Sequence, residues 1–158
     1  MQNGSSLIFR TWSEFLAPFV EVCAIELSRR RIKMKLALFN RLELLVKTIA
    51  PAFLSYLDKL FASLGHSMGG LISYKLVRHL RKEYGRQPSH LFVSASRAPQ
   101  IPSPKPPIQA LPETEFKQEL CRLNNDRPAS VLENTELMEL LTPLLRADFS
   151  VLETYVYT

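Results

Sequence analysis

Residues 60–70 read Leu-Phe-Ala-Ser-Leu-Gly-His-Ser-Met-Gly-Gly. Its first half, residues 60–64, is a short apolar run that predicts a buried strand. After the glycine pair, apolar residues recur every three or four positions over 71–80, which predicts an amphipathic helix that Gly85 ends. Only a few residues remain between the two elements, with Ser67 among them. The stretch therefore predicts a strand, a sharp turn and a helix, with a serine at the turn.

The turn itself has the pattern of a nucleophile position. Gly65 and Gly69 stand two residues before and two residues after Ser67. A strained strand-to-helix turn leaves no room for side chains beside the serine, so we expect both positions to require glycine. The helix that begins at Met68 directs its first N–H groups toward a reacting carbonyl, where the Met68 N–H can stabilise an oxyanion. We therefore interpret Ser67 as the nucleophile of an acyl-transfer site.

Strand and helix patterns alternate along the first two thirds of the chain. Alternation of this kind predicts an α/β fold with a parallel sheet and flanking helices. Cys23 lies in one expected strand, where we expect a small buried hydrophobic residue. The other expected strands cover 20–27 and 90–95, and the other expected helices cover 5–17, 40–58 (with Asn40 as cap and a kink or break at Pro51), 113–123, 131–141 and 142–157.

Proline marks a change in the organisation of the chain. Six of the 11 prolines fall within residues 99–112, which predicts an extended connector without helix or strand. Beyond it the patterns are helical only. We therefore expect three segments: a partial core with the nucleophile turn at 1–98, the proline-rich connector at 99–112 and a helical, lid-like region at 113–158.

A base and an acid for Ser67 are hard to find among the remaining residues. In this architecture both follow the serine along the chain. His66 precedes the serine, His79 falls two to three turns along the next helix, and His90 begins a strand at the end away from the site. Asp126 and Asp148 lie in the connector and helix region, and a surface or cap position suits Asp148. No complete Ser-His-Asp set is predicted in the chain.

Taken together, these motifs resemble the discrete (type II) thioesterases that accompany nonribosomal peptide and polyketide synthases, members of the α/β-hydrolase superfamily. The resemblance implies a partial α/β-hydrolase fold with a helical lid insertion, in which Ser67 forms an acyl-enzyme and Met68 supplies a backbone oxyanion donor. It also places Gln2 at the second oxyanion donor, before the remnant Asn3-Gly4 of a glycine-rich turn. The stretches that carry the resemblance are 9–12, 64–70, 91–94 with 97–99, and 136–141 running into 143–149.

The implied activity is hydrolysis of acyl or aminoacyl thioesters on the phosphopantetheine arm of a carrier protein. In the family, a first strand precedes the glycine-rich turn, and the catalytic aspartate and histidine lie on strands beyond the lid. The resemblance therefore implies a chain truncated at both ends, inactive or impaired by itself. Two alternatives stay open: a noncatalytic module that binds a carrier protein, and an esterase or acyltransferase of the same fold.

Composition sets limits on compartment and partners. With 158 residues, 46% hydrophobic and 22% charged, the chain is typical of a globular domain. The net charge of +5 is concentrated in residues 29–35 and in a series from Lys75 to Arg86, which we interpret as a solvated helix face rather than a nucleic-acid site. The two cysteines, and the absence of a signal segment or an 18-residue apolar run, predict a cytoplasmic protein. We expect a monomer without cofactor, metal or membrane partner.

Overall fold

The computed structural model describes residues 9, 11–25, 39–123 and 135–157. The chain divides into two compact units. One unit combines Met1–Leu38 with Leu111–Leu144, and the other combines Phe39–Ala110 with Leu145–Thr158. The second unit contains the serine turn. The three-segment division expected from the sequence stays a prediction, although residues 99–112 do contain neither helix nor strand.

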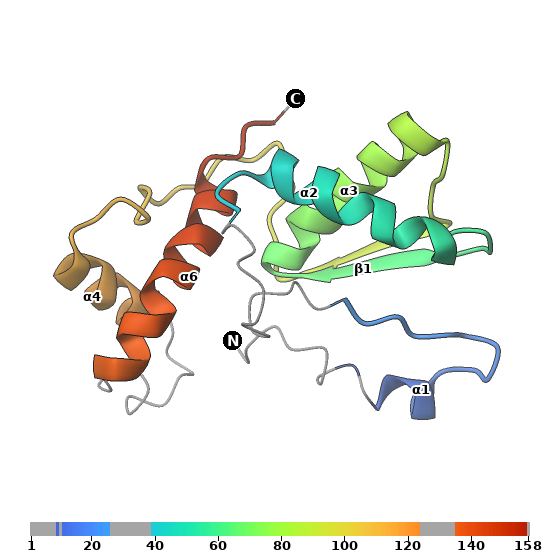
Figure 1. Cartoon of the computed structure of the whole chain (residues 1–158), viewed down its shortest axis with the longest axis horizontal. Helices are drawn as coiled ribbons and strands as arrows, with labels where there is room; N and C mark the ends of the chain where they lie inside the picture. Colours follow the sequence, from blue (N-terminus) through green and yellow to red (C-terminus); the bar gives the residue numbers. More distant parts are fainter. Residues whose placement is uncertain (1–8, 10, 26–38, 124–134, 158) are drawn as a thin grey trace. The chain divides into compact units, whose positions relative to one another are not determined.

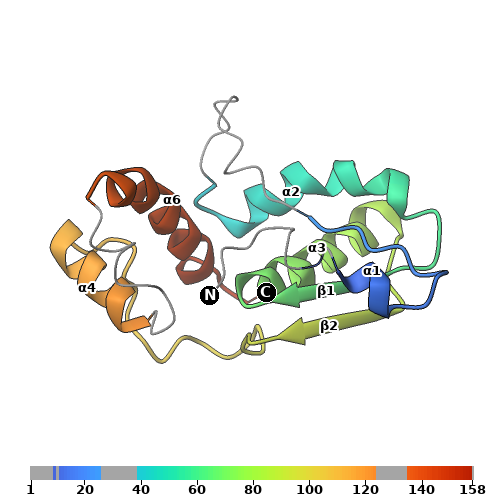
Figure 2. The ribbon, with the colours of Figure 1, turned by 90° about the horizontal axis from the view of Figure 1, so that it is seen from below.

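The sheet of the second unit is parallel, as the alternating patterns predicted. β1 (Ala62–His66) pairs with β2 (His90–Ser94) in a register that runs from Ala62 opposite His90 to His66 opposite Ser94. The connection between them is α3 (Met68–Tyr84), which lies against one face of the two strands (Figures 1 and 2). The carboxyl ends of both strands therefore meet at the same edge, directly before Ser67.

Helix α3 forms where its apolar spacing predicts a helix. Its buried residues Ile72, Leu76 and Leu80 are four apart and make one continuous stripe. Gly85, with φ of 65°, ends the helix in the left-handed conformation that glycine adopts without strain. Burial of a leucine of this kind contributes about 1.5–3 kcal/mol, so this stripe is a main source of stability for the strand-turn-helix unit.

Helix α2 (Leu42–Phe53) packs on α3 and is followed by the short 3-10 helix η2 (Leu54–Tyr56). Pro51 lies inside α2, whose regular α-helix continues to Phe53, so the kink or break expected at Pro51 stays a prediction. The expected cap is wrong. Arg41 occupies the cap position because the first helical residue is Leu42, and the Asn40 carbonyl instead accepts hydrogen bonds from Ser150 Oγ (3.0 Å) and Thr154 Oγ1 (3.3 Å).

The strand expected at 20–27 is wrong over its described part. Residues 20–25 form neither helix nor strand, and Cys23, expected to be buried, is exposed. A strand exists only through a hydrogen-bond ladder with a neighbour, and within the described residues no ladder reaches this segment. An apolar, β-branched composition was therefore not enough to form a strand at residues 20–25. Of the helix expected at 5–17, α1 (Trp12–Phe15) is described.

The two strands are also more exposed than their apolar sequences predicted. Phe92 retains 53% of its accessible surface and Val93 48%. Within this unit, α3 packs against the strands from one side, and the unit's described residues supply no second layer on the other face. Burial was predicted from strand composition, but it depends on a second layer that composition does not specify.

The first unit contains α1, α4 (Glu113–Leu123) and the beginning of α6 (Thr135–Glu153). Both views place α4 beside the first half of α6 (Figures 1 and 2). Its most buried side chains are Phe116, Leu120 and Met138. The helix expected at 113–123 is confirmed.

A single helix replaces the two expected at 131–141 and 142–157, and residues 131–134 lie outside the described range. α6 continues through Pro143, which removes one backbone donor but does not end the helix. In the preceding position, Thr142 Oγ1 donates a hydrogen bond to the Met138 carbonyl at 2.6 Å, which holds the turn before the proline.

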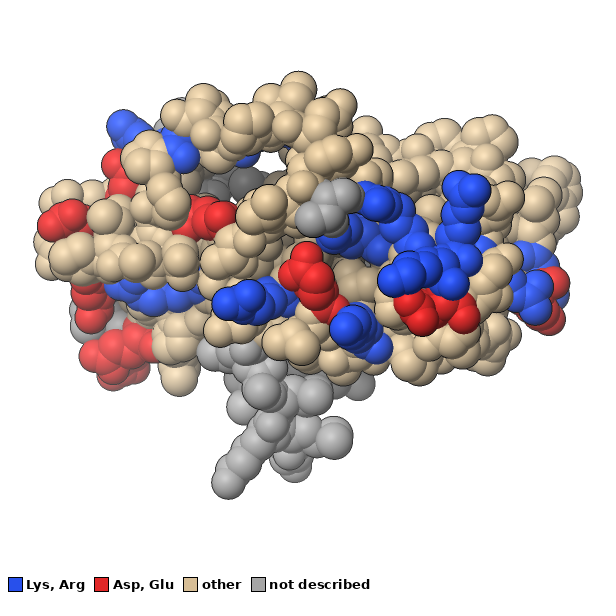
Figure 3. All heavy atoms as spheres, turned by 90° about the horizontal axis from the view of Figure 1, so that it is seen from above, with Lys and Arg blue, Asp and Glu red and all other residues tan. Residues whose placement is uncertain are grey.

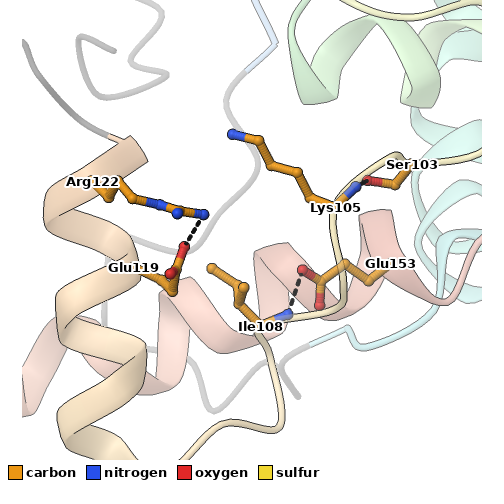
Figure 4. Close-up of polar contacts among 6 residues, drawn as sticks. All are labelled: Ser103, Lys105, Ile108, Glu119, Arg122 and Glu153. Atoms are coloured by element: carbon orange, nitrogen blue, oxygen red, sulfur yellow. Dashed lines mark hydrogen bonds and ion pairs between the residues drawn. The ribbon is translucent and has the colours of Figure 1, made fainter.

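A carboxylate anchors the end of the proline-rich segment to the second half of α6, within the second unit. Glu153 accepts hydrogen bonds from the backbone N–H of Ile108 (2.9 Å) and of Gln109 (3.0 Å), the first of which is drawn in Figure 4. Arg146 Nη1 donates to the Gln109 carbonyl at 2.6 Å. Charge-assisted bonds of this type are about twice as strong as neutral ones, so they fix this segment to the helix.

Two absences complete the description. None of the helices in the described ranges is both long and apolar enough to cross a bilayer. Within the same ranges, no three His, Cys, Asp or Glu side chains group together in a way that could hold a metal ion.

Candidate active site

Ser67 is the one residue that separates the end of β1 from the start of α3. Its backbone has φ of 55° and ψ of −120°, a conformation that residues other than glycine rarely adopt. Strain of this kind costs about 1–3 kcal/mol and persists only where the surrounding structure imposes it. The observed turn is therefore as sharp as the sequence pattern predicted.

Two backbone hydrogen bonds impose this conformation. The Ser67 N–H donates to the Ser94 carbonyl at 2.8 Å, which continues the pairing of β1 with β2 by one residue. The Gly70 N–H donates to the Ser67 carbonyl at 2.9 Å and begins the helix. The serine is thus held from one side by the strand pairing and from the other by the helix.

The structure changes which glycines the turn requires. A Cβ on Gly65 would overlap the carbonyl group of Gly69 and would lie 2.6 Å from the Gly70 nitrogen. A Cβ on Gly70 would lie 2.9 Å from both Val93 Cγ1 and Ser96 Cβ. A Cβ on Gly69 would meet nothing within 4 Å, so the prediction that Gly69 is sterically required is wrong. The crowded positions are Gly65 and Gly70, because the β1 backbone crosses the first turn of α3 and that turn packs on β2.

Of the two predicted oxyanion donors, the structure describes only Met68. Met68 is the first residue of α3, and its N–H is one of the first four of the helix, which have no acceptor within the helix. That position agrees with a role as donor, which stays a prediction. Gln2 lies outside the described residues.

The three histidines of the chain are all described, and each ring has its own surroundings. His66 Nδ1 lies 3.3 Å from Ser94 Oγ. The His79 ring meets the Tyr84 ring edge-on, with 6.1 Å between centroids. His90 stacks on Phe92 at 5.8 Å and pairs with Ala62, where both strands begin. Four strand residues, roughly 13 Å, separate that edge from His66, so His90 lies at the opposite end of the sheet from Ser67.

Of the two candidate acids, the structure describes only Asp148. Asp148 is a half-buried residue inside α6, in agreement with the helical position expected for it. Asp126 lies outside the described residues.

An open, mainly apolar cavity of about 350 Å³ lies beside the first turns of α3. α3 contributes Leu71 and Tyr74, β2 contributes Leu91 and Val93, and residues 96–99 complete the lining. Sequence analysis did not identify this cavity. Its size falls in the range of ligand-binding pockets, and its walls suit an apolar group.

The strain at Ser67 gives a stability prediction. We expect Ser67→Gly to raise the free energy of unfolding by about 1–2 kcal/mol relative to Ser67→Ala, because glycine adopts a positive φ without cost whereas alanine keeps the Cβ. Both variants lose the hydroxyl, so their difference isolates the backbone term. Urea denaturation followed by circular dichroism measures it, and equal stabilities would show that the turn is unstrained.

Comparison with known proteins identifies the fold and the family. The model of the thioesterase domain matches residues 2–156. The gramicidin S biosynthesis protein GrsT of Aneurinibacillus migulanus is 42% identical over 98% of this chain and 60% of its own length. LgrE of Brevibacillus parabrevis, named a linear gramicidin dehydrogenase, is 38% identical over the same shares. The chain thus spans about 60% of the length of these relatives.

A solved structure agrees with these relatives. The thioesterase RedJ from the prodiginine pathway of Streptomyces coelicolor aligns with a TM-score of 0.78 and 30% identity, over 98% of this chain and 61% of RedJ. The expected fold is confirmed: a partial α/β-hydrolase fold, with a parallel sheet and flanking helices. The resemblance to the type II thioesterases is confirmed as well, and the chain belongs to the thioesterase domain family.

Proposed function

We propose that this chain carries the nucleophile of a thioesterase site that releases acyl or aminoacyl groups from carrier-protein thioesters in secondary metabolism. The observation that carries the proposal is the strained Ser67 between β1 and α3. A second support is the Met68 N–H at the start of the helix. Membership of the thioesterase family, with relatives named for peptide biosynthesis, supports the substrate class.

The proposed reaction proceeds through an acyl-enzyme. Ser67 Oγ attacks the thioester carbonyl carbon, and the Met68 N–H donates to the oxyanion that develops. The carbon–sulfur bond then breaks, the thiol leaves with the proton of the serine hydroxyl, and the acyl group remains on Ser67. Water attacks the ester, which releases the carboxylic acid and restores the hydroxyl. The cavity beside α3 is the candidate seat for the apolar part of the acyl group.

Proton transfer from the Ser67 hydroxyl is expected to limit the rate of this reaction. A serine hydroxyl needs a base, and the rings of His66, His79 and His90 lie against Ser94, Tyr84 and Phe92. We therefore propose that the 158 residues by themselves form and hydrolyse the acyl-enzyme slowly.

A dehydrogenase, the activity in the name of LgrE, fits this turn less well. A dinucleotide-binding turn reads Gly-x-Gly-x-x-Gly, and its second glycine lets the backbone approach the pyrophosphate. Here Gly65 and Gly70 occupy the outer positions, but Ser67 stands at the central one.

An oxyester substrate in place of a thioester is an alternative within the same fold. Hydrolysis of either substrate passes through the same acyl-enzyme on Ser67.

Acyl transfer to Ser67 tests the proposal directly. Incubation of the chain with an acyl-N-acetylcysteamine thioester should add one acyl mass, which intact-protein mass spectrometry detects and peptide mapping places on Ser67. The Ser67→Ala variant is the control and should remain unmodified. An adduct that persists in Ser67→Ala, or no adduct after prolonged incubation, would contradict the assignment of the nucleophile.

A further inference from the structure

Cationic side chains gather on the outer surface of α2 and α3, away from the sheet. Figure 3 shows Lys and Arg side chains grouped there, with a few acidic side chains between them. We call this surface the basic face, and define it by Lys47 of α2, Arg78, Arg81 and Lys82 of α3, and Arg86 just after α3. All five residues are exposed. The sequence of the series on α3 predicts a solvated helix face.

Helical spacing explains why these charges share one side of α3. Arg78, Arg81 and Lys82 are three and four residues apart, which places neighbouring side chains on one surface. The buried stripe of Ile72, Leu76 and Leu80 occupies the opposite side of the helix. The cations therefore cannot turn toward the core, and they form a fixed array in solvent.

Arg78 is held in place before any partner binds. Its Nη1 donates to the Tyr74 hydroxyl at 3.0 Å, and its guanidinium carbon lies 5.5 Å from the centre of the Tyr74 ring. A side chain positioned in this way loses less conformational freedom on binding than an unrestrained arginine. Arg78 is thus a preorganised cation at the centre of the basic face.

Lys75, although adjacent, belongs to a different environment. Its side chain is only 13% exposed, pairs with Glu43 at 3.8 Å, and lies 5.2 Å above the ring of Tyr155. Burial raises the pKa of the Tyr155 hydroxyl above its ordinary value, with Tyr74 as a further cause and Arg78 opposing the shift. Lys75 is therefore a structural cation and is left out of the basic face.

Glu83 neutralises little of the charge of Lys82. Glu83 lies 3.7 Å from Lys82, but the Lys82 side chain is 82% exposed, and an ion pair in such a position contributes little. The mutual repulsion of the cations is a cost in the isolated chain that an acidic partner would relieve.

We propose that the basic face binds the acidic surface of the carrier protein that delivers the thioester. This inference rests on the function proposed above. The interspersed Glu43 and Glu83 favour a protein partner with charges of both signs over the continuous phosphate backbone of a nucleic acid. The basic face and the nucleophile also share one rigid element, because α3 begins directly after Ser67.

The distance along α3 agrees with substrate delivery on a flexible arm. At 1.5 Å per residue, Arg78 and Lys82 lie roughly 15 and 21 Å along the helix axis from Met68. A carrier protein docked on the basic face does not place its own surface at Ser67. A thioester at the end of a long prosthetic arm bridges this separation, whereas a substrate attached directly to the partner's surface does not.

Binding to a phosphopantetheinylated peptidyl carrier protein, measured by surface plasmon resonance, tests the proposal. The Arg81→Gln/Lys82→Gln variant should raise Kd roughly tenfold at low salt. The control variant, Lys59→Gln/Lys105→Gln, removes two positive charges from exposed residues outside the basic face and should stay within about twofold. Higher salt should weaken the wild-type complex and reduce the difference between the variants.

Several outcomes would overturn this assignment. Equal losses in the two variants would show that net charge, not the basic face, governs binding. No detectable binding at low salt, or tighter binding to duplex DNA than to the carrier protein, would also refute it. The Ser67→Ala variant should bind as wild type does, so failure of acyl transfer to Ser67 would refute the chemistry without touching the docking surface.

Discussion

Replacing Gly65 by alanine is expected to lower the free energy of unfolding by about 3 kcal/mol, because the new methyl group meets backbone that cannot move aside. The atoms in its way are the Gly69 carbonyl and the Gly70 nitrogen, both in the first turn of α3. Relief would require β1 and α3 to separate, which would disturb the bond from the Ser67 N–H to the Ser94 carbonyl. Urea denaturation measures the loss.

Gly69→Ala is the matched control for this prediction. It makes the same chemical change in the same motif, but the new Cβ meets open space. Alanine also has a higher helix propensity than glycine, so this variant should be more stable by about 0.5–1 kcal/mol. Opposite signs for the two substitutions would follow from the geometry of the turn. Equal destabilisation would contradict it.

The second large effect concerns turnover. Steady-state hydrolysis of an acyl-N-acetylcysteamine thioester by this chain should have a kcat about 10⁴-fold or more below that of the thioesterase RedJ on the same substrate. The reason is that the contacts of the three histidine rings are with Ser94, Tyr84 and Phe92, and loss of a positioned base from a serine enzyme costs several orders of magnitude.

Ser67→Ala provides the control for turnover as well. Its steady-state rate should equal that of the wild-type chain within error, because both rates lie close to the uncatalysed reaction. A substantial rate that Ser67→Ala abolishes would refute this prediction and would require a base for Ser67 within the chain. Slow acylation in the single-turnover experiment remains compatible with the prediction, because that experiment detects one event per molecule.

Local sequence was a good guide where each element depends on its own residues. The stripe of Ile72, Leu76 and Leu80 specified α3, and Gly85 ended it in the conformation that glycine favours. The parallel pairing of β1 with β2 followed from the strand-helix-strand order. The conformation of Ser67 followed from the spacing of the motif around it.

Sequence was a poor guide where a residue depends on a distant neighbour. Residues 20–25 have strand composition but no ladder partner among the described residues, and Phe92 remains exposed because the described residues of its own unit supply no second layer over it. The motif repeats symmetrically about Ser67 and so favours Gly69 over Gly70, whereas crowding depends on Val93 in β2 and on Ser96 just after it. No pattern in the chain indicated that Glu153 would bind the backbone of residues 108 and 109.

Local residues are therefore enough to predict that Ser67 occupies a sharp turn between a strand and a helix, because turn geometry and helix periodicity are set within a few residues. Tertiary structure alone decided what surrounds that turn. It brought the His66 ring to the Ser94 hydroxyl, required glycine at position 70, and held Arg78 against Tyr74 on an exposed basic face. Each of these depends on which surfaces pack together, and packing joins residues that the linear order of the chain keeps apart.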